Sequence, residues 1–182
     1  VHIETNYGAS FPEGWMYAQG HGSGSSLGAR LVLTGGRFKI GPLTPLTWLL
    51  CLRLPGMPAL DFRTTDLDIV KVQRLSFEDK ELVLEARRRG SRAPCVLLRL
   101  KAPVETFGKD GGLYVPTIDG FGRSPGAVES FSAFAEVHVT GLPSGREATF
   151  NLKGCVLEFG GSFQDPAVCR STEDATRGGR RR

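Results

Sequence analysis

The chain has 182 residues, of which 40 % are hydrophobic and 23 % charged, a composition that is ordinary for one globular domain with a sizeable core. Its longest apolar run, Trp48 to Leu52, is far shorter than the roughly 20 apolar residues that a transmembrane helix needs. The 24 glycines and 11 prolines are scattered between short apolar runs. This pattern favours many strands and turns over long helices.

The net charge of +4 is concentrated at the C-terminal end, where five arginines and two acidic residues lie between 170 and 182. We therefore predict one β-rich domain over 1–165 and a flexible basic tail over 166–182. Nucleic-acid modules interleave basic residues with stacking aromatic residues on one face, and this pattern is missing from the sequence. We expect no nucleic-acid partner.

The four cysteines are far apart, form no CxxC pair and have no histidine at ligand spacing. Three of them lie in apolar runs, which favours buried free thiols in a reducing compartment over disulfides. No metal site is expected. The sequence also lacks the GxSxG, GxxxxGK[ST] and HExxH signatures of common enzyme classes.

Taken in chain order, the strands that alternation and turn signals predict lie at 15–19, 27–34, 47–54, 59–63, 67–75, 81–88, 94–102, 130–140, 146–152 and 154–159. The strand at 27–34 is expected to end at Gly35-Gly36, and the segment 94–102 also fits a short helix. Residues 105–128 are rich in glycine and irregular, as functional or disordered loops are. About nine or ten short strands with tight turns close most simply into an antiparallel β-barrel, since closure removes exposed edges.

The stretch from Glu4 to Gln19 combines an acid, an amide and a turn with aromatic residues on one strand face. Elsewhere, Asp61, Asp119 and Glu129 stand in turn-rich or strand-end positions. A carboxyl group in an apolar pocket has a raised pKa and can donate a proton at neutral pH, while aromatic faces stabilise a cation. Together these groups suit protonation of an alkene and capture of the carbocation. A capped turn or a solvated loop is the alternative reading of each acid.

The opening residues resemble the tocopherol cyclase family, which reads there as an acid, an Asn-aromatic-Gly, a Phe-Pro and a Trp-x-x-x-Gln. The matching residues are Glu4, Asn6, Tyr7, Gly8, Phe11, Pro12, Trp15 and Gln19. Further pieces follow in the family's order: Leu33 to Gly36, Leu84 to Arg87, Pro116, Thr117 and Asp119, Glu129 and Ser130, and Glu158 with Gly160 and Gly161. The similarity spans residues 3–162.

The resemblance implies a lipocalin-like β-barrel that corresponds to the C-terminal half of a two-half protein. The chain begins at Val1, so we expect a fragment or a processed product whose N-terminal half is missing. The family cyclises a prenylated hydroquinone to a chromanol without a metal or an organic cofactor. For a photosynthetic eukaryote the resemblance implies a plastid location, with peripheral contact to a membrane or lipid droplet.

We therefore expect Glu4, Asp119 or Glu129 to donate the proton. Asn6 and Gln19 would bind the phenol head, and Trp15 with Tyr17 would form the cavity wall. Two alternatives remain open at this point. One is a non-catalytic carrier of an isoprenoid or another apolar ligand, and the other is a structural barrel that its own side chains fill.

Overall fold

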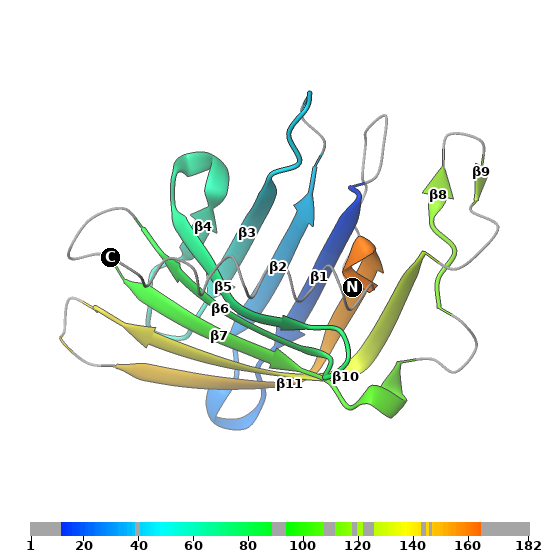
Figure 1. The fold of residues 1–182 in the computed structure, drawn as a ribbon. Coiled ribbons are helices and arrows are strands. Elements are labelled where there is room, and N and C mark those ends of the chain that lie inside the picture. Colours follow the sequence, from blue (N-terminus) through cyan, green and yellow to red (C-terminus); the bar gives the residue numbers. More distant parts are fainter. Residues whose placement is uncertain are drawn as a thin grey trace.

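The structure is a computed structural model that describes residues 12–38, 41–88, 94–107, 112–117, 120–121, 126–142, 145 and 147–164. Nine antiparallel strands form one sheet, and two short strands pair beside it (Figure 1). The nine strands are β1 (Gly14–His21), β2 (Arg30–Arg37), β3 (Leu46–Arg53), β4 (Leu60–Arg63), β5 (Ile69–Ser76), β6 (Glu81–Arg87), β7 (Cys95–Lys101), β10 (Ala127–Thr140) and β11 (Ala148–Gly161). The short pair is β8 (Pro116–Thr117) with β9 (Gly120–Phe121).

The helical segments of the described residues are single 3₁₀ turns of three residues each. They are η1 (Gly24–Ser26), η2 (Thr64–Asp66), η3 (Val104–Thr106) and η4 (Ser162–Gln164). Within this part of the chain, none is long and apolar enough to cross a bilayer as a helix. The segment 94–102, which could have been a helix, is the strand β7.

The sheet curls into a nearly closed barrel, as the sequence predicts. Its strand order is β4-β3-β2-β1-β11-β10-β7-β6-β5, so the pairing of β1 with β11 joins two runs of neighbouring strands. The edges are β4 and β5, which follow each other in the chain with η2 between them. The barrel wall therefore has one seam, at β4 and β5, where no strand ladder is formed.

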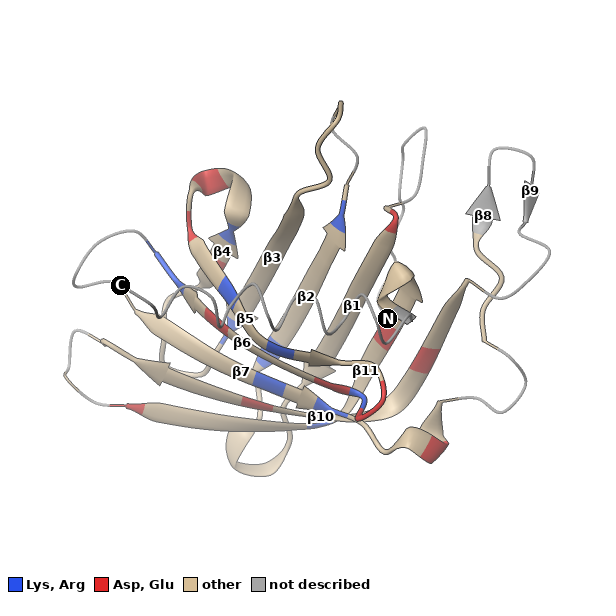
Figure 2. Ribbon diagram, in the orientation of Figure 1, with Lys and Arg blue, Asp and Glu red and all other residues tan. Residues whose placement is uncertain are grey.

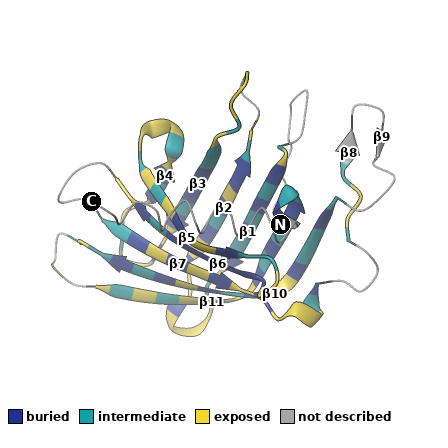
Figure 3. Cartoon of the chain, in the orientation of Figure 1, coloured by how far each residue is buried: buried dark blue, intermediate teal, exposed yellow. Residues whose placement is uncertain are grey.

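Strand alternation separates an inner face, which forms the core, from an outer face. Buried and less buried residues alternate along most strands (Figure 3). The largest fully buried side chains include Phe62, Phe159, Phe163, Met16, Leu31, Leu50 and Leu84. Burying a side chain of this size contributes about 1.5–3 kcal/mol, so the core accounts for most of the stability of the barrel.

Several predicted strand bounds differ from the structure, among them the starts of β2, β5 and β10, and glycines explain two further differences. β2 does not end at Gly35-Gly36 but continues through them to Arg37. Gly35 lies under the indole of Trp48, where an added Cβ would stand 2.0 Å from Cε3 of the ring. The predicted strands at 146–152 and 154–159 are one strand, β11, because Gly154 adopts a φ of 65° at an irregularity in its pairing with β10.

A buried lysine lies among aromatic side chains of the inner face. The ammonium nitrogen of Lys80 lies 3.0 Å from the centroid of the Phe77 ring and 4.8 Å from that of Phe107. Phe159 packs edge-on against Phe77, with ring centroids 5.8 Å apart. The cation–π contacts compensate part of the cost of burying this charge.

Candidate functional site

The strand β1 presents two different faces, because its residues alternate in burial. Met16 and Ala18 are fully buried in the core. Trp15, Tyr17 and Gln19 are partly buried and lie on the outer face. The prediction that these three share one strand face is confirmed, but the face they share is the outside of the barrel wall, so Trp15 and Tyr17 do not line its interior.

Trp15 lies flat across the neighbouring strand β11. Its ring occupies the space above Gly160, where an added Cβ would stand 2.0 Å from Cε2 of the indole. In this position Nε1 of Trp15 donates a 2.6 Å hydrogen bond to Oε1 of Glu158. A hydrogen bond to a charged group is short and strong, so Trp15 fixes the carboxyl group of Glu158 on the outer face.

Tyr17 continues the polar contacts along β1. Its hydroxyl donates a 2.8 Å hydrogen bond to Oε1 of Gln19. The amide nitrogen of Gln19 in turn lies 3.5 Å from Nε2 of His21, at the limit of a hydrogen bond. The three side chains share one face because they are two residues apart, and they form a polar row beside the Trp15–Glu158 contact.

Two glutamates face each other across β10 and β11. Glu129 and Glu158 are directly paired in the sheet register, which places their Cβ atoms about 4.5–5.5 Å apart on the outer face. Burial raises the pKa of Glu129, and the negative charge of Glu158 raises it further. Both causes shift the Glu129 carboxyl group toward its protonated form relative to an exposed glutamate.

An uncharged strip leads away from this pair across the outer face. Glu158 is paired with Tyr17, Tyr17 with Thr34, and Thr34 with Leu49. Charged residues stand only at the ends of β2 and β3 and are missing from the length of β1 (Figure 2). The strip can therefore contact an apolar molecule without desolvating a charge.

The structure brings together four of the seven residues to which the sequence analysis gives a role in the site, while Asp61, the other candidate acid, pairs with Arg53. Glu129, Trp15, Tyr17 and Gln19 all lie around Glu158 on the outer face. Glu4, Asn6 and Asp119 lie outside the described residues, and so does the tail at 166–182.

Glu158 itself was not predicted as a site residue. The sequence does indicate which way Glu158 points. Side chains alternate along β11, so Leu157 and Phe159 face inward and Glu158 faces outward. Only the pairing of β11 with both β1 and β10 shows what it contacts.

The prediction of buried free thiols is confirmed for Cys155, whereas Cys51 and Cys95 are free but only partly buried. Cys51, Cys95 and Cys155 are free, and Cys155 is fully buried. Burial raises the pKa of the Cys155 thiol to about 11. In the described ranges, no three residues of the His, Cys, Asp and Glu types are grouped as a metal ion would require.

No protein-family model, no curated protein and no solved structure matches this chain.

Proposed function

We propose that this chain binds a prenylated hydroquinone on the outer face of β1, β10 and β11 and cyclises it to a chromanol. The observation that carries the proposal is the facing pair Glu129 and Glu158 beside Trp15. The raised pKa of Glu129 favours a proton at this position. Alkene protonation requires a carboxylic acid in its protonated form, and a raised pKa widens the pH range over which Glu129 keeps its proton.

In the proposed reaction, the Glu129 carboxyl group gives its proton to one carbon of the prenyl double bond. The π electron pair forms the new C–H bond, and the other carbon becomes a tertiary cation. The aromatic faces of Trp15 and Tyr17 stabilise that cation. The phenol oxygen closes the ring through a new C–O bond, and its proton passes to the Glu129 carboxylate, so that the acid is regenerated.

Glu158 and the uncharged strip have supporting roles in this proposal. Burial raises the pKa of Glu129, and Glu158, held by Trp15, raises it further through its negative charge. The prenyl tail lies over Tyr17, Thr34 and Leu49, which follow one another across β1, β2 and β3. The polar row of Tyr17 and Gln19 offers hydrogen bonds to the phenol head.

The test is chromanol formation by the full chain incubated with a prenylated hydroquinone and followed by chromatography. Glu129→Gln is expected to lower the rate about 100-fold or more, because general acid catalysis contributes 10²–10⁴-fold. Glu136→Gln is the matched control, since Glu136 is an exposed glutamate on the same strand. Its rate should equal that of the unmodified chain.

Two outcomes would contradict the proposal. If Glu129→Gln and Glu136→Gln react at the same rate, Glu129 is not the acid. If the unmodified chain forms no chromanol but binds the hydroquinone and releases it unchanged, the protein is a carrier of apolar ligands, which was the alternative at the sequence level.

A further inference from the structure

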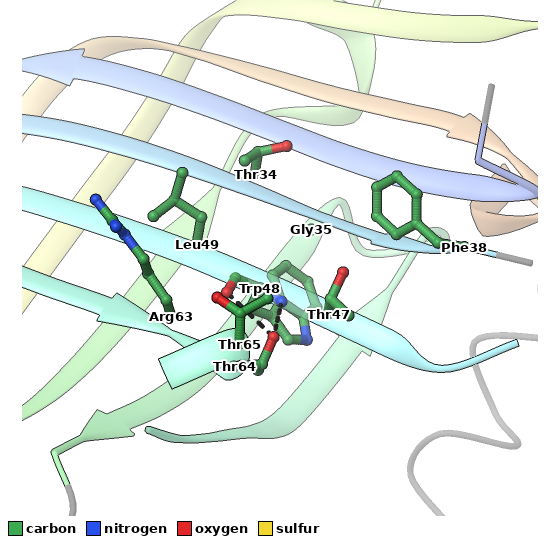
Figure 4. Close-up of a pocket in the computed structure, with 9 residues that line it drawn as sticks. All are labelled: Thr34, Gly35, Phe38, Thr47, Trp48, Leu49, Arg63, Thr64 and Thr65. Atoms are coloured by element: carbon green, nitrogen blue, oxygen red, sulfur yellow. Dashed lines mark hydrogen bonds between the residues drawn. The ribbon is translucent and has the colours of Figure 1, made fainter. Parts of the chain in front are cut away.

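A second site lies beside β3, at the point where β4 stops. β4 pairs with β3 only over Leu49 to Leu52, and η2 then carries the chain away. Next to the uncovered part of β3 there is a hollow of about 260 Å³ (Figure 4). This volume lies just below the roughly 300–1,000 Å³ of pockets that hold drug-sized ligands, so the hollow suits a molecule with one aromatic ring.

The walls of the hollow are mainly apolar and aromatic. Phe38, Trp48 and Leu49 supply them, and the Trp48 ring lies over Gly35, which also lines the hollow. The hydroxyl of Thr64 takes the place of the missing strand partner, since it accepts a 3.1 Å hydrogen bond from the backbone N–H of Trp48. This hydrogen bond holds η2 against β3 at the hollow.

A buried donor in this wall has no acceptor. The Trp48 side chain is only 4 % exposed, and its Nε1 has no hydrogen-bond partner among the residues that the structure describes. Leaving a buried donor unpaired costs about 1–3 kcal/mol, and such a group calls for an explanation. Trp48 lines the hollow, so this unpaired donor belongs to its wall.

A positive charge stands at the rim of the same hollow. The guanidinium group of Arg63 lines it (Figure 4). Among the ion pairs of the described residues, Arg53 takes Asp61, and none involves the Arg63 side chain. Thr64 and Thr65 also line the hollow, with the Thr64 hydroxyl donating a 3.4 Å hydrogen bond to the carbonyl of Trp48 and the Thr65 hydroxyl donating one of 3.3 Å to Oδ1 of Asp66.

We propose that this hollow binds a small aromatic carboxylate. The ring contacts Phe38, Trp48 and Leu49, and the carboxylate lies at the guanidinium group of Arg63. Guanidinium groups match carboxylates in geometry and charge. The hollow adjoins the strip proposed for the prenyl tail at Thr34 and Leu49, but it uses neither Glu129, Glu158 nor Trp15.

The two tryptophans of the chain make a direct test available. Trp15→Phe leaves Trp48 as the sole source of tryptophan emission, and Trp48→Phe leaves Trp15. The probe is 4-nitrobenzoate, whose nitro group quenches indole fluorescence, and its neutral control is 4-nitrobenzamide. We expect saturable quenching of the Trp15→Phe protein and no saturable quenching of the Trp48→Phe protein.

Arg63→Gln, made in the Trp15→Phe protein, should weaken 4-nitrobenzoate binding about tenfold and leave 4-nitrobenzamide binding unchanged. Arg30→Gln is the matched control, because Arg30 is an exposed arginine at the other end of β2, away from the hollow. Equal quenching of the two single-tryptophan proteins, or equal 4-nitrobenzoate affinity in the Arg63→Gln and Arg30→Gln proteins, would overturn the proposal. Loss of 4-nitrobenzoate binding in a Glu129→Gln protein would overturn the separation of the two sites.

Discussion

The two tryptophans of the barrel use the same local arrangement on opposite faces of the wall. Trp48 lies over Gly35 of β2 on the inner face, and Trp15 lies over Gly160 of β11 on the outer face. In each case an added glycine Cβ would stand 2.0 Å from the indole ring. A glycine in one strand therefore marks the position of an aromatic ring from its neighbour.

The surroundings of the two rings differ. The Trp48 N–H is buried without a partner, whereas the Trp15 N–H holds the Glu158 carboxyl group. Trp48 is enclosed by the core, while Trp15 can move toward solvent. The packing of Trp48 on Gly35 should therefore mainly stabilise the fold, whereas the packing of Trp15 on Gly160 should mainly position the Glu158 carboxyl group.

Among the substitutions that test the difference between Trp48 and Trp15, we expect the largest loss of stability when the Trp48 ring is removed. Trp48→Ala should lower the free energy of unfolding by about 3–5 kcal/mol, as truncation of a core aromatic residue does. Trp15→Ala should lower it by about 1–2 kcal/mol, because it removes one hydrogen bond and a partly buried ring. Urea denaturation followed by far-ultraviolet circular dichroism measures both values.

Phe131→Ala provides the control for these substitutions, since the exposed Phe131 side chain should contribute within about 0.5 kcal/mol. Equal costs for Trp48→Ala and Trp15→Ala would remove the distinction between the two faces.

Replacing Gly35 or Gly160 by alanine should lower the free energy of unfolding by a smaller amount. Gly35→Ala should cost about 1–3 kcal/mol, because the core prevents the Trp48 ring from moving away from the new methyl group. Gly160→Ala should cost about 1 kcal/mol, since Trp15 can rotate outward at the expense of its bond to Glu158.

Thermal unfolding in the same buffer compares the two glycine variants. In a Trp48→Ala background, the cost of Gly35→Ala should fall, because the ring that clashes is gone. A cost that stays the same in that background would show that the glycine is needed for another reason.

The smallest effect concerns the carboxyl pair that Trp15 supports. Since the folded pKa of Glu129 is raised, its contribution to stability is present below the ordinary pKa and is lost as the pH rises through the raised value. Glu129→Gln should therefore gain stability relative to the unmodified chain between about pH 4 and pH 7. Urea midpoints measured across this range test the sign.

Glu158→Gln should reduce that pH dependence, because the charge of Glu158 is the second cause of the shift after burial. A pH dependence that grows in the Glu158→Gln protein would contradict the pairing of the two carboxyl groups.

The sequence predicts the strands of this fold well, because period-two alternation is a local property. β3, β6 and β7 lie within about one residue of their predicted ranges. Alternation also groups Trp15, Tyr17 and Gln19 correctly, but it does not say which face is inside when both carry large side chains. Met16 and Ala18 form the inner face because of what packs against them.

The remaining errors come from contacts between strands that are distant in sequence. Gly35 reads as a strand end, since the Trp48 ring that covers it comes from the next strand. Glu158 has no local signal for its role, because Trp15 and Glu129 reach it only through the pairing of β11 with β1 and β10. Local periodicity carries no information about such partners.

The pairing of β1 with β11 also has a kinetic consequence. Most ladders of the barrel join strands that are close in the chain, but this one pairs Gly14 with Gly161. Closing so long a loop loses conformational entropy before the hydrogen bonds and side-chain contacts of the ladder can offset that loss. We expect the two runs of strands to form first and their junction at Trp15 and Glu158 to limit the folding rate, which places the candidate site at the last part of the wall to assemble.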